Sequence, residues 1–177
     1  MIVDPTNLKP RLHGNNILWL ANVGLSNQVF QHVLGCKIQA TCETQSPEDL
    51  VPPNAGYGFR TADQNGTLIA FSKSRWAEPE RSLVRIYDIG SHVTTTITNE
   101  NAFVDAISID PNFVAFNTYP GVNGGDIYAY DIHQHRLLNV TNTPSSQYSQ
   151  RDPSLTFEES GKSILSYSDG DLHINRL

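Results

Sequence analysis

The stretch Asp126-Ile127-Tyr128-Ala129-Tyr130-Asp131-Ile132 decides how this sequence folds. Successive side chains of a β-strand point to opposite faces of its sheet. In this stretch Ile127 and Ala129 fall on one face, while Tyr128, Tyr130 and Ile132 fall on the other. A strand that is apolar on both faces is covered on both faces. The stretch therefore predicts a β-strand in a sheet that is packed between two neighbouring layers.

The pattern around this strand recurs along the chain in a constant order. Residues 84–89 match residues 127–132 at an offset of 43, and residues 171–174 match residues 126–129. An apolar strand precedes each of these elements, and a short polar strand follows the first two. The preceding strands are residues 68–71, 113–116 and 164–167, and the following ones are residues 97–99 and 140–142. Such a period indicates one supersecondary unit that is repeated and stacked.

Turn-forming residues separate these strands. Asp63-Gln64-Asn65-Gly66, Asp110-Pro111-Asn112 and Glu159-Ser160-Gly161 predict the turns that lead into the apolar strands. The threonine-rich residues 92–98 are polar enough for the outer edge of a sheet, where exposed strands avoid aggregation. The best helix candidate, residues 25–34, is interrupted by β-formers and closes on Gly35. The expected fold class is therefore all-β, built from antiparallel sheets.

Three segments carry a resemblance to a known family. They are Gly125-Asp126-Ile127-Tyr128, then Leu138-Asn139-Val140-Thr141-Asn142, then Gly161-Lys162-Ser163-Ile164. This order resembles the TolB-type, WD-like β-propeller repeat, which has a Gly-Asp-Ile-Tyr strand, a Leu-Thr-Asn outer strand and an Asp-Gly-Lys turn. The match is good over residues 125–174, fair over 63–124 and poor before residue 60. Glu159-Ser160-Gly161 departs from the family turn, and Leu155-Thr156-Phe157 stands where the family has Trp-Ser-Pro.

The resemblance implies β-propeller blades of four antiparallel strands. At about 43 residues a blade, 177 residues make about three and a half to four blades, whereas closed propellers have four to eight. We expect residues 14–177 to form the propeller-like domain, with a degenerate blade over 14–60 and clearer blades over 61–177. In the degenerate blade the expected strands are residues 16–21, 28–32 and 36–41.

Closure of the ring follows from this blade count. We expect the last unit to lack its outer strand. Residues 1–13 form an N-terminal segment that is one candidate for a closing strand, and a second copy or a partner segment are the others. A partial propeller completed by oligomerisation or by a partner chain is the first expectation, and a closed four-blade ring is the second.

Composition and charge exclude several classes of partner. Lys+Arg 12 against Asp+Glu 18 gives a net charge of -6, which lacks the basic footprint that nucleic-acid binding requires. The longest apolar run, residues 17–21, is far shorter than the roughly 20 residues of a membrane span.

Cys36 and Cys42 are expected to be free buried thiols. The start Met1-Ile2-Val3-Asp4-Pro5 lacks a leader pattern. If Met1 is the native start, the expected compartment is the cytoplasm. If the chain comes from a TolB-like exported protein, the expected location is extracytoplasmic.

Catalytic and metal-binding signals are scarce. His133 and His135 could share a strand face, but the repeat places both in a turn, where no carboxylate or cysteine completes a metal set. Asp169-Gly170-Asp171 lacks the further ligands of a calcium loop and is better explained as a tight turn. No nucleophile elbow, zinc-protease motif or phosphate loop is present in the sequence. We therefore expect no enzyme activity, no metal and no cofactor.

Two long connections are the best candidates for function. Residues 73–82 and 119–125 occupy equivalent places in successive units, so both should emerge on one face. Arg75, Trp76, Arg81 and Tyr119 belong to the residue types that dominate binding interfaces, and they are the expected partner-binding residues. The alternative for Trp76 is packing against its own blade.

The expected function is a non-catalytic interaction module that binds a protein or peptide partner through this loop face. One alternative is the propeller domain of a peptidase- or lyase-type enzyme whose catalytic part is not on this chain. The other alternative is a structural subunit of a larger assembly.

Overall fold

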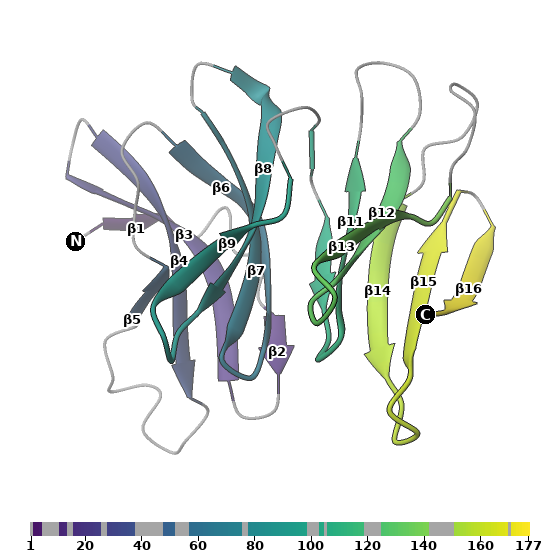
Figure 1. Ribbon diagram of the computed structural model, residues 1–177. Coiled ribbons are helices and arrows are strands. Elements are labelled where there is room, and N and C mark those ends of the chain that lie inside the picture. Colours follow the sequence, from purple (N-terminus) through teal and green to yellow (C-terminus); the bar gives the residue numbers. More distant parts are fainter. Residues whose placement is uncertain are drawn as a thin grey trace.

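The computed structural model (Figure 1) describes the backbone of residues 2–4, 11–13, 16–25, 28–37, 48–51, 57–75, 78–98, 103–104, 106–118, 125–141, 151–169 and 171–177. Side chains are described for residues 12, 17, 18, 59–75, 81–98, 103–104, 106–118, 125–141, 152–169 and 171–177. Every regular element within these ranges is a β-strand, which confirms the predicted all-β class. The described residues include no helix that is long and apolar enough to span a membrane.

Two four-stranded antiparallel sheets form the middle of the molecule. Each follows the order of its strands along the chain. The second sheet consists of β6 (Tyr57–Asn65), β7 (Leu68–Arg75), β8 (Glu78–Asp88) and β9 (Val93–Thr96). The third consists of β10 (Ile107–Ile109), β11 (Phe113–Thr118), β12 (Asp126–Asp131) and β13 (Arg136–Asn139). Both repeats predicted from the sequence are therefore complete four-stranded units.

The first sheet has five described strands and uses the N-terminal residues. Its strands are β1 (Ile2–Asp4), β2 (Arg11–His13), β3 (Asn16–Leu25), β4 (Gln28–Lys37) and β5 (Glu48–Val51). Both β1 and β2 pair with β3, so the N-terminal segment extends the first sheet instead of closing the ring against the last one. The helix candidate, residues 25–34, lies mainly in β4, whose backbone pairs with β3 over its whole length.

The first sheet also differs in its boundaries from the degenerate blade expected over residues 14–60. The strand expected over 16–21 extends to residue 25. The strand expected over 28–32 lies in β4, which continues to residue 37, and residues 38–41 of the strand expected over 36–41 are outside the described residues. Cys36 lies in β4, while Cys42 and the side chains of both cysteines are outside the described residues.

The last sheet consists of β14 (Arg151–Phe157), β15 (Ser163–Ser168) and β16 (Leu172–Arg176), in that order. The four sheets stand in a row with their faces together, and the first and last are at opposite ends (Figure 1). The described sheets thus form an open, partial propeller, and a closed four-blade ring is excluded.

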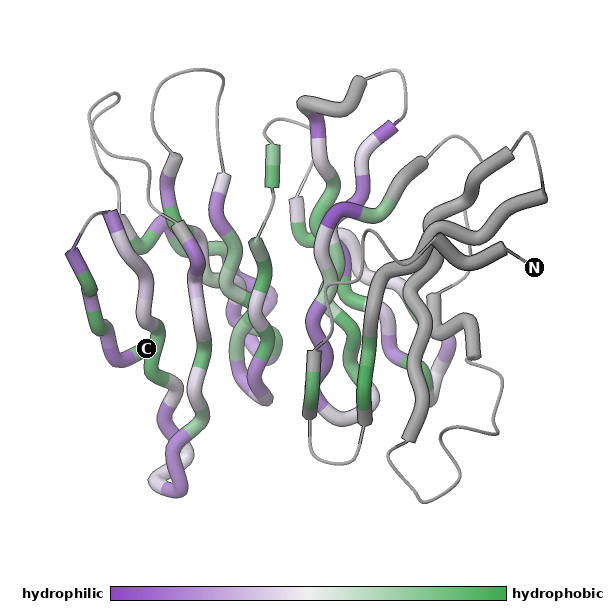
Figure 2. The backbone as a smooth tube through the Cα atoms, turned by 180° about the vertical axis from the view of Figure 1, so that it is seen from behind, coloured by the Kyte–Doolittle hydropathy of each residue, from purple (hydrophilic) through white to green (hydrophobic). Residues whose placement is uncertain are grey.

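The core lies in the seams between neighbouring sheets. Leu18 of the first sheet packs with Phe59, Ile69 and Phe71 of the second. The next seam joins the second and third sheets through residues such as Val84. Leu165 of the last sheet contacts the third in a smaller cluster of Ala115, Ile127 and Leu165. Figure 2 shows the same layout, with apolar segments in the strands and polar segments in many of the turns.

Turn positions largely follow the sequence. Asp110-Pro111-Asn112 joins β10 to β11, and Glu159-Ser160-Gly161 lies between β14 and β15. Asp63, Gln64 and Asn65 were expected in a turn but lie in β6, because pairing with β7 continues until Asn65 meets Leu68. The predicted edge strand is β9, and all four of its residues are exposed.

Candidate functional site

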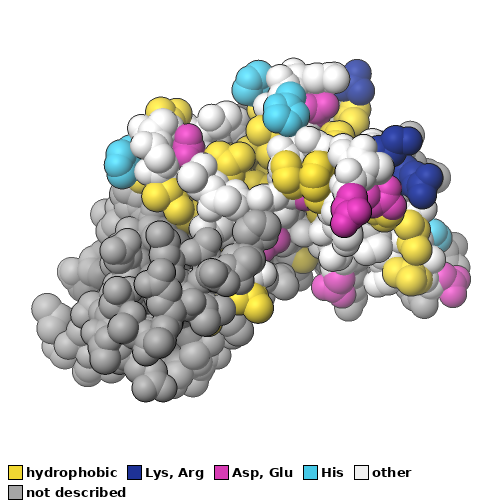
Figure 3. Space-filling view, turned by 90° about the horizontal axis from the view of Figure 1, so that it is seen from below, with side chains coloured by type: hydrophobic (Ala, Val, Ile, Leu, Met, Phe, Trp, Pro, Cys, Tyr) yellow, Lys and Arg dark blue, Asp and Glu magenta, His cyan; other side chains and the backbone are white. Residues whose placement is uncertain are grey.

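Two turns of the same design lie at the ends of the second and third sheets. Tyr87-Asp88-Ile89-Gly90-Ser91-His92 connects β8 to β9, and Tyr130-Asp131-Ile132-His133-Gln134-His135 connects β12 to β13. Figure 3 shows the molecule from below, a face on which several histidine side chains are exposed at separate places. Tyrosine, aspartate and histidine recur at the same positions, so the chain builds one turn structure twice.

The aspartate of each turn accepts hydrogen bonds from the turn itself. The Gly90 amide donates to Asp88 Oδ1 at 2.9 Å, and the Ser91 hydroxyl donates to Asp88 Oδ2 at 2.9 Å. Asp131 Oδ1 accepts the amides of His133 at 2.9 Å and Gln134 at 2.8 Å. Hydrogen bonds from the Ser91 hydroxyl and the Gly90 amide hold the pKa of the Asp88 carboxyl below its ordinary value. Asp88 is therefore ionised at neutral pH.

The histidine of each turn pairs with the tyrosine. Tyr87 Oη lies 2.8 Å from His92 Nδ1, and Tyr130 Oη lies 3.0 Å from His135 Nδ1. Both histidines have left-handed backbones, with φ of 59° at His92 and 54° at His135. Burial raises the pKa of the Tyr130 hydroxyl, and the Asp131 carboxylate raises it further. Each turn is thus tied to a buried ring of its own sheet.

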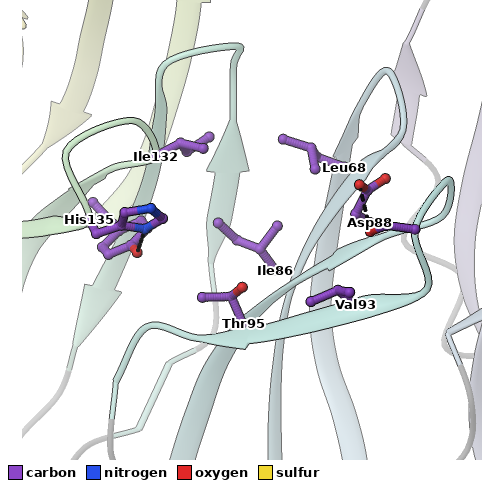
Figure 4. A pocket seen from close by; sticks show the side chains of 9 residues that line it. Leu68, Ile86, Asp88, Val93, Thr95, Ile132 and His135 are labelled. Carbon is purple, nitrogen blue, oxygen red and sulfur yellow. Dashed lines mark hydrogen bonds between the residues drawn. The ribbon is translucent and has the colours of Figure 1, made fainter.

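A cavity of about 200 Å³ lies between these two turns. Its wall is mostly apolar, and its polar groups are one carboxylate, two hydroxyls, one phenol and one imidazole. The lining residues are Leu68, Ile86, Asp88, Ser91, Val93, Thr95, Tyr130, Ile132 and His135. Figure 4 shows Ile86 and Thr95 near the centre, with Ile132 and His135 on one side and Asp88 on the other. The cavity is smaller than the roughly 300–1,000 Å³ of drug-sized sites, so it suits one side chain or a small group.

The cavity depends on small differences between the second and third units. At an offset of 43 residues, Thr95 on β9 corresponds to Leu138 on β13, and Val93 corresponds to Arg136. The smaller threonine leaves space beside Ile86 that a leucine would fill. The repeat pattern aligns these units but does not give the distance between neighbouring sheets, so the sequence did not predict this cavity.

Two of the four expected partner-binding residues, Arg75 and Arg81, are described, and they lie toward the other end of the second sheet. Arg75 is the last residue of β7 and Arg81 lies in β8, and both are exposed. They flank the paired residues Ser74 and Ser82 on adjacent strands. Trp76 and Tyr119 lie outside the described residues. Figure 1 shows that β7 and β11, the strands that precede the two connections, finish at the same end of neighbouring sheets.

Arg60 and Phe103 at this end of the second sheet were not singled out from the sequence. Arg60 Nε donates to Ser74 Oγ at 3.0 Å, and its guanidinium carbon lies 4.3 Å from the centroid of the Phe103 ring. This is the geometry of a cation–π contact. A bulge in β6 between Phe59 and Thr61 breaks the alternation of side chains. The period of two along the strand therefore does not predict which face Arg60 occupies.

The sequence offered His133 and His135 as candidate metal ligands. In the described part of the chain, no group of three or more histidine, cysteine, aspartate or glutamate side chains could hold a metal ion. His133 and His135 occupy the predicted turn and have different contacts. His133 Nε2 lies 3.3 Å from Asn112 Oδ1, whereas the His135 ring pairs with Tyr130.

Comparisons with known proteins identify relatives by structure alone. No protein-family model and no curated protein sequence matches the chain. A protein assigned as TolB from Agrobacterium tumefaciens aligns with a TM-score of 0.61 at 14% identity, over 93% of this chain and 57% of that one. The β-propeller domain of the Trilobed protease from Pyrococcus furiosus aligns with a TM-score of 0.60 at 10% identity, over 94% and 56%.

A puromycin-hydrolyzing peptidase from Mycobacterium tuberculosis aligns with a TM-score of 0.62 at 10% identity, over 97% of this chain and 30% of that one. The antiparallel sheets and these alignments together define the fold as a β-propeller. Within that class the fold is TolB-like, which confirms the resemblance found in the sequence. The chain spans less than two thirds of the length of each of these structures.

Proposed function

We propose that this chain is a non-catalytic β-propeller module that binds a protein or peptide partner through the face bearing the β7–β8 and β11–β12 connections. One observation carries the proposal: β7 and β11, the strands that precede these connections, finish at the same end of neighbouring sheets, and Arg75 and Arg81 are exposed. Loops on a rigid scaffold are the usual carriers of binding function. Arg75, Trp76, Arg81 and Tyr119 are the proposed contact residues.

The contact between Arg60 and Phe103 supports this assignment, because it stiffens the end of the second sheet. The Arg60–Ser74 hydrogen bond fixes the strand that leads into the β7–β8 connection. Ser72 Oγ also donates to the Val104 carbonyl at 3.3 Å, and the Val104 amide donates to Ser82 Oγ at 3.3 Å. A scaffold that is already ordered lowers the entropic cost of binding a partner.

Replacement of Trp76 by alanine tests the proposal. We expect Trp76→Ala to weaken capture of a partner by about 2 kcal/mol or more, the size of a binding hot spot, with little change in melting temperature. Phe157→Ala is the matched control, since Phe157 is an aromatic residue 45% exposed on a different sheet. A lower melting temperature with capture intact would instead place Trp76 in the packing of its own blade.

A second candidate is the propeller domain of a peptidase. Its support is that the structural neighbours include prolyl endopeptidases, a puromycin-hydrolyzing peptidase and the Trilobed protease. In that case the catalytic part lies in another chain or in another part of a longer protein. Peptidase activity that appears only when such a part is added would favour this candidate.

The last sheet supports a third candidate, a subunit whose propeller is completed by a partner chain or a second copy. Strand β16 is at the edge of the described sheet, and it exposes 72% of Leu172 and 64% of Ile174. Exposed strand edges are templates for pairing with another chain. Sedimentation of the isolated chain tests this candidate, because self-association is expected to decrease on Ile174→Lys.

A further inference from the structure

We propose that the cavity between the second and third sheets, together with the outer edge of β9, binds an extended peptide as an added strand. The peptide places one aliphatic side chain in the cavity and a lysine or arginine beside Asp88. This site lies away from Arg75 and Arg81, and it goes beyond the function proposed above.

The first observation is the open edge of β9. Strand β9 is the last strand of its sheet among the described elements, and all four residues are exposed. Its sequence is Val-Thr-Thr-Thr, which favours strands and contains no charge or proline to prevent pairing. Strand β13, its counterpart in the third sheet, begins with Arg136. The edge of β9 is therefore the better template for an added strand.

The hydrogen-bond pattern shows which groups of β9 are available. The Ile97 amide donates to the Val84 carbonyl at 2.8 Å, on the side that faces β8. Hydrogen-bonded pairs alternate with non-hydrogen-bonded pairs along an antiparallel ladder. Counted from the bonded Ile97–Val84 pair, Thr94 and Thr96, which lie opposite Tyr87 and Arg85, belong to non-hydrogen-bonded pairs. The amides and carbonyls of Thr94 and Thr96 consequently point away from β8, toward an added strand.

The second observation is the position of the cavity relative to this edge. Val93 and Thr95 line it from β9, while Ile86 and Leu68 line it from inside the sheet. A strand added outside β9 places alternate side chains on the face that Val93 and Thr95 share. One such side chain reaches the cavity, and the apolar wall and small volume favour an aliphatic group of about the size of leucine.

The third observation is the charge of the lining. Asp88 is the only carboxylate in the lining, which contains no lysine or arginine. Asp88 pairs with Val93, whereas Ile86 pairs with Thr95, two residues farther along β9. A cation two positions from the aliphatic side chain therefore falls beside Asp88, on the same face of the peptide strand.

The fourth observation is that both rims of the cavity are formed before binding. Hydrogen bonds from Gly90 and Ser91 hold the Asp88 rim, and the Tyr130–His135 pair holds the opposite rim. A site with fixed rims does not need to order its own groups when a peptide binds. Strand addition supplies affinity through main-chain hydrogen bonds, and a pocket for a side chain supplies specificity.

The test is an NMR titration of amide shifts with acetylated, amidated Thr-X-Thr-Lys-Thr peptides, where X is Val, Leu, Ile or Phe. We expect shifts at Thr94, Thr96 and the cavity residues. Replacing X by Ser or Lys by Glu in the peptide should weaken binding. Absence of shifts at β9 with every peptide at about 1 mM, which corresponds to about -4 kcal/mol, overturns the proposal.

Protein variants separate the edge from the cavity. Thr94→Pro removes an outward amide and leaves the ladder with β8 intact, and Thr95→Phe fills the cavity from an exposed position. Each should weaken binding about tenfold or more, equivalent to about 1.4 kcal/mol. Leu137→Pro is the matched control, because it is the equivalent position of β13, and it should bind as the wild type does.

Other results would overturn the proposal. Unchanged binding by both Thr94→Pro and Thr95→Phe would exclude β9 and the cavity as the site. Self-association of the chain that Thr94→Pro abolishes would show that a second copy occupies the edge. Trp76→Ala should not affect binding of these peptides. A negative peptide titration therefore does not bear on the function proposed above, which is tested separately by capture of a partner with Trp76→Ala.

Discussion

The Tyr87 hydroxyl lies 2.8 Å from His92 Nδ1, across the turn that joins β8 to β9. The Tyr87 ring is 5% exposed in the core between the first and second sheets, whereas His92 is exposed. The bond thus ties a surface turn with a left-handed residue to the packed interior. Tyr130 and His135 repeat the relationship one unit later, at the seam between the second and third sheets.

Tyr130→Phe should destabilise the fold by about 1 kcal/mol, because it removes the hydrogen bond to His135 and leaves the ring in place. Burial, and secondly the Asp131 carboxylate, raise the pKa of the Tyr130 hydroxyl. The unfolded chain therefore releases this proton at a lower pH than the folded chain does. The protonated Tyr130 hydroxyl makes its full contribution to the free energy of unfolding below the ordinary tyrosine pKa of about 10. This contribution is lost as pH rises through the higher pKa of the folded state.

Urea unfolding of wild type and Tyr130→Phe at neutral and alkaline pH measures both effects. The difference in unfolding free energy should shrink as pH rises above about 10. Tyr128→Phe is the control, since Tyr128 Oη accepts its 3.3 Å hydrogen bond from Asn139 in an exposed setting. A constant difference at all pH values would contradict the assigned cause.

Asp88→Asn should reduce stability at neutral pH by weakening the acceptor of the Ser91 and Gly90 hydrogen bonds. These bonds hold the pKa of the Asp88 carboxyl below its ordinary value. The contribution is therefore complete above the unfolded pKa of about 4 and is lost as pH falls through the lower folded value. Thermal unfolding from neutral to acid pH should show wild type and variant converging below about pH 4. A gap that widens in acid would exclude this role for Asp88.

Much of the fold could be predicted because its strongest signals are local. The strands around Ile127 and Val84 are apolar on both faces, and this pattern requires a sheet packed on both sides. The turns at Asp110 and Glu159 carry residues whose backbone preferences define turns. The start of the chain was harder, since the pairing of β1 with β3 depends on contacts across some 20 residues that no local pattern encodes.

The candidate sites were less predictable because they depend on how sheets meet. The cavity requires Ile132 and His135 of one sheet to face Ile86 and Thr95 of another, and register along a strand does not determine that distance. The recurrence of histidine after Tyr-Asp-Ile was visible in the sequence. Its pairing with tyrosine required the left-handed backbone at His92 and His135, which is uncommon for a residue other than glycine.

Gly161→Ala should destabilise the fold by about 1–2 kcal/mol, because alanine is strained in the left-handed region. Gly161 has a φ of 82°, and a Cβ there would meet nothing within 4 Å, so the cost is one of backbone conformation and not of space. Gly90→Ala is the control: a Cβ at Gly90 meets Asp88 Oδ1 at 3.4 Å, an ordinary contact, and no left-handed φ is required. Differential scanning calorimetry should give the larger loss at Gly161. Equal losses at the two positions would argue against backbone strain.

Asn112→Ala should loosen the last sheet more than the others. Asn112 Nδ2 donates across the seam to Ser163 Oγ at 3.2 Å and to the Gly161 carbonyl at 3.3 Å. Loss of these bonds should cost about 1 kcal/mol, equivalent to roughly fivefold faster amide exchange where opening is local.

Hydrogen exchange of wild type and Asn112→Ala should show this acceleration in β15 and β16, with β7 and β11 little changed. Asn139→Ala is the matched control, since Asn139 Nδ2 bonds to Asp126 Oδ2 at 2.8 Å within the third sheet. The control should leave exchange in β15 as in the wild type. Uniform acceleration in all four sheets would mean that Asn112 stabilises the whole fold and not the attachment of the last sheet.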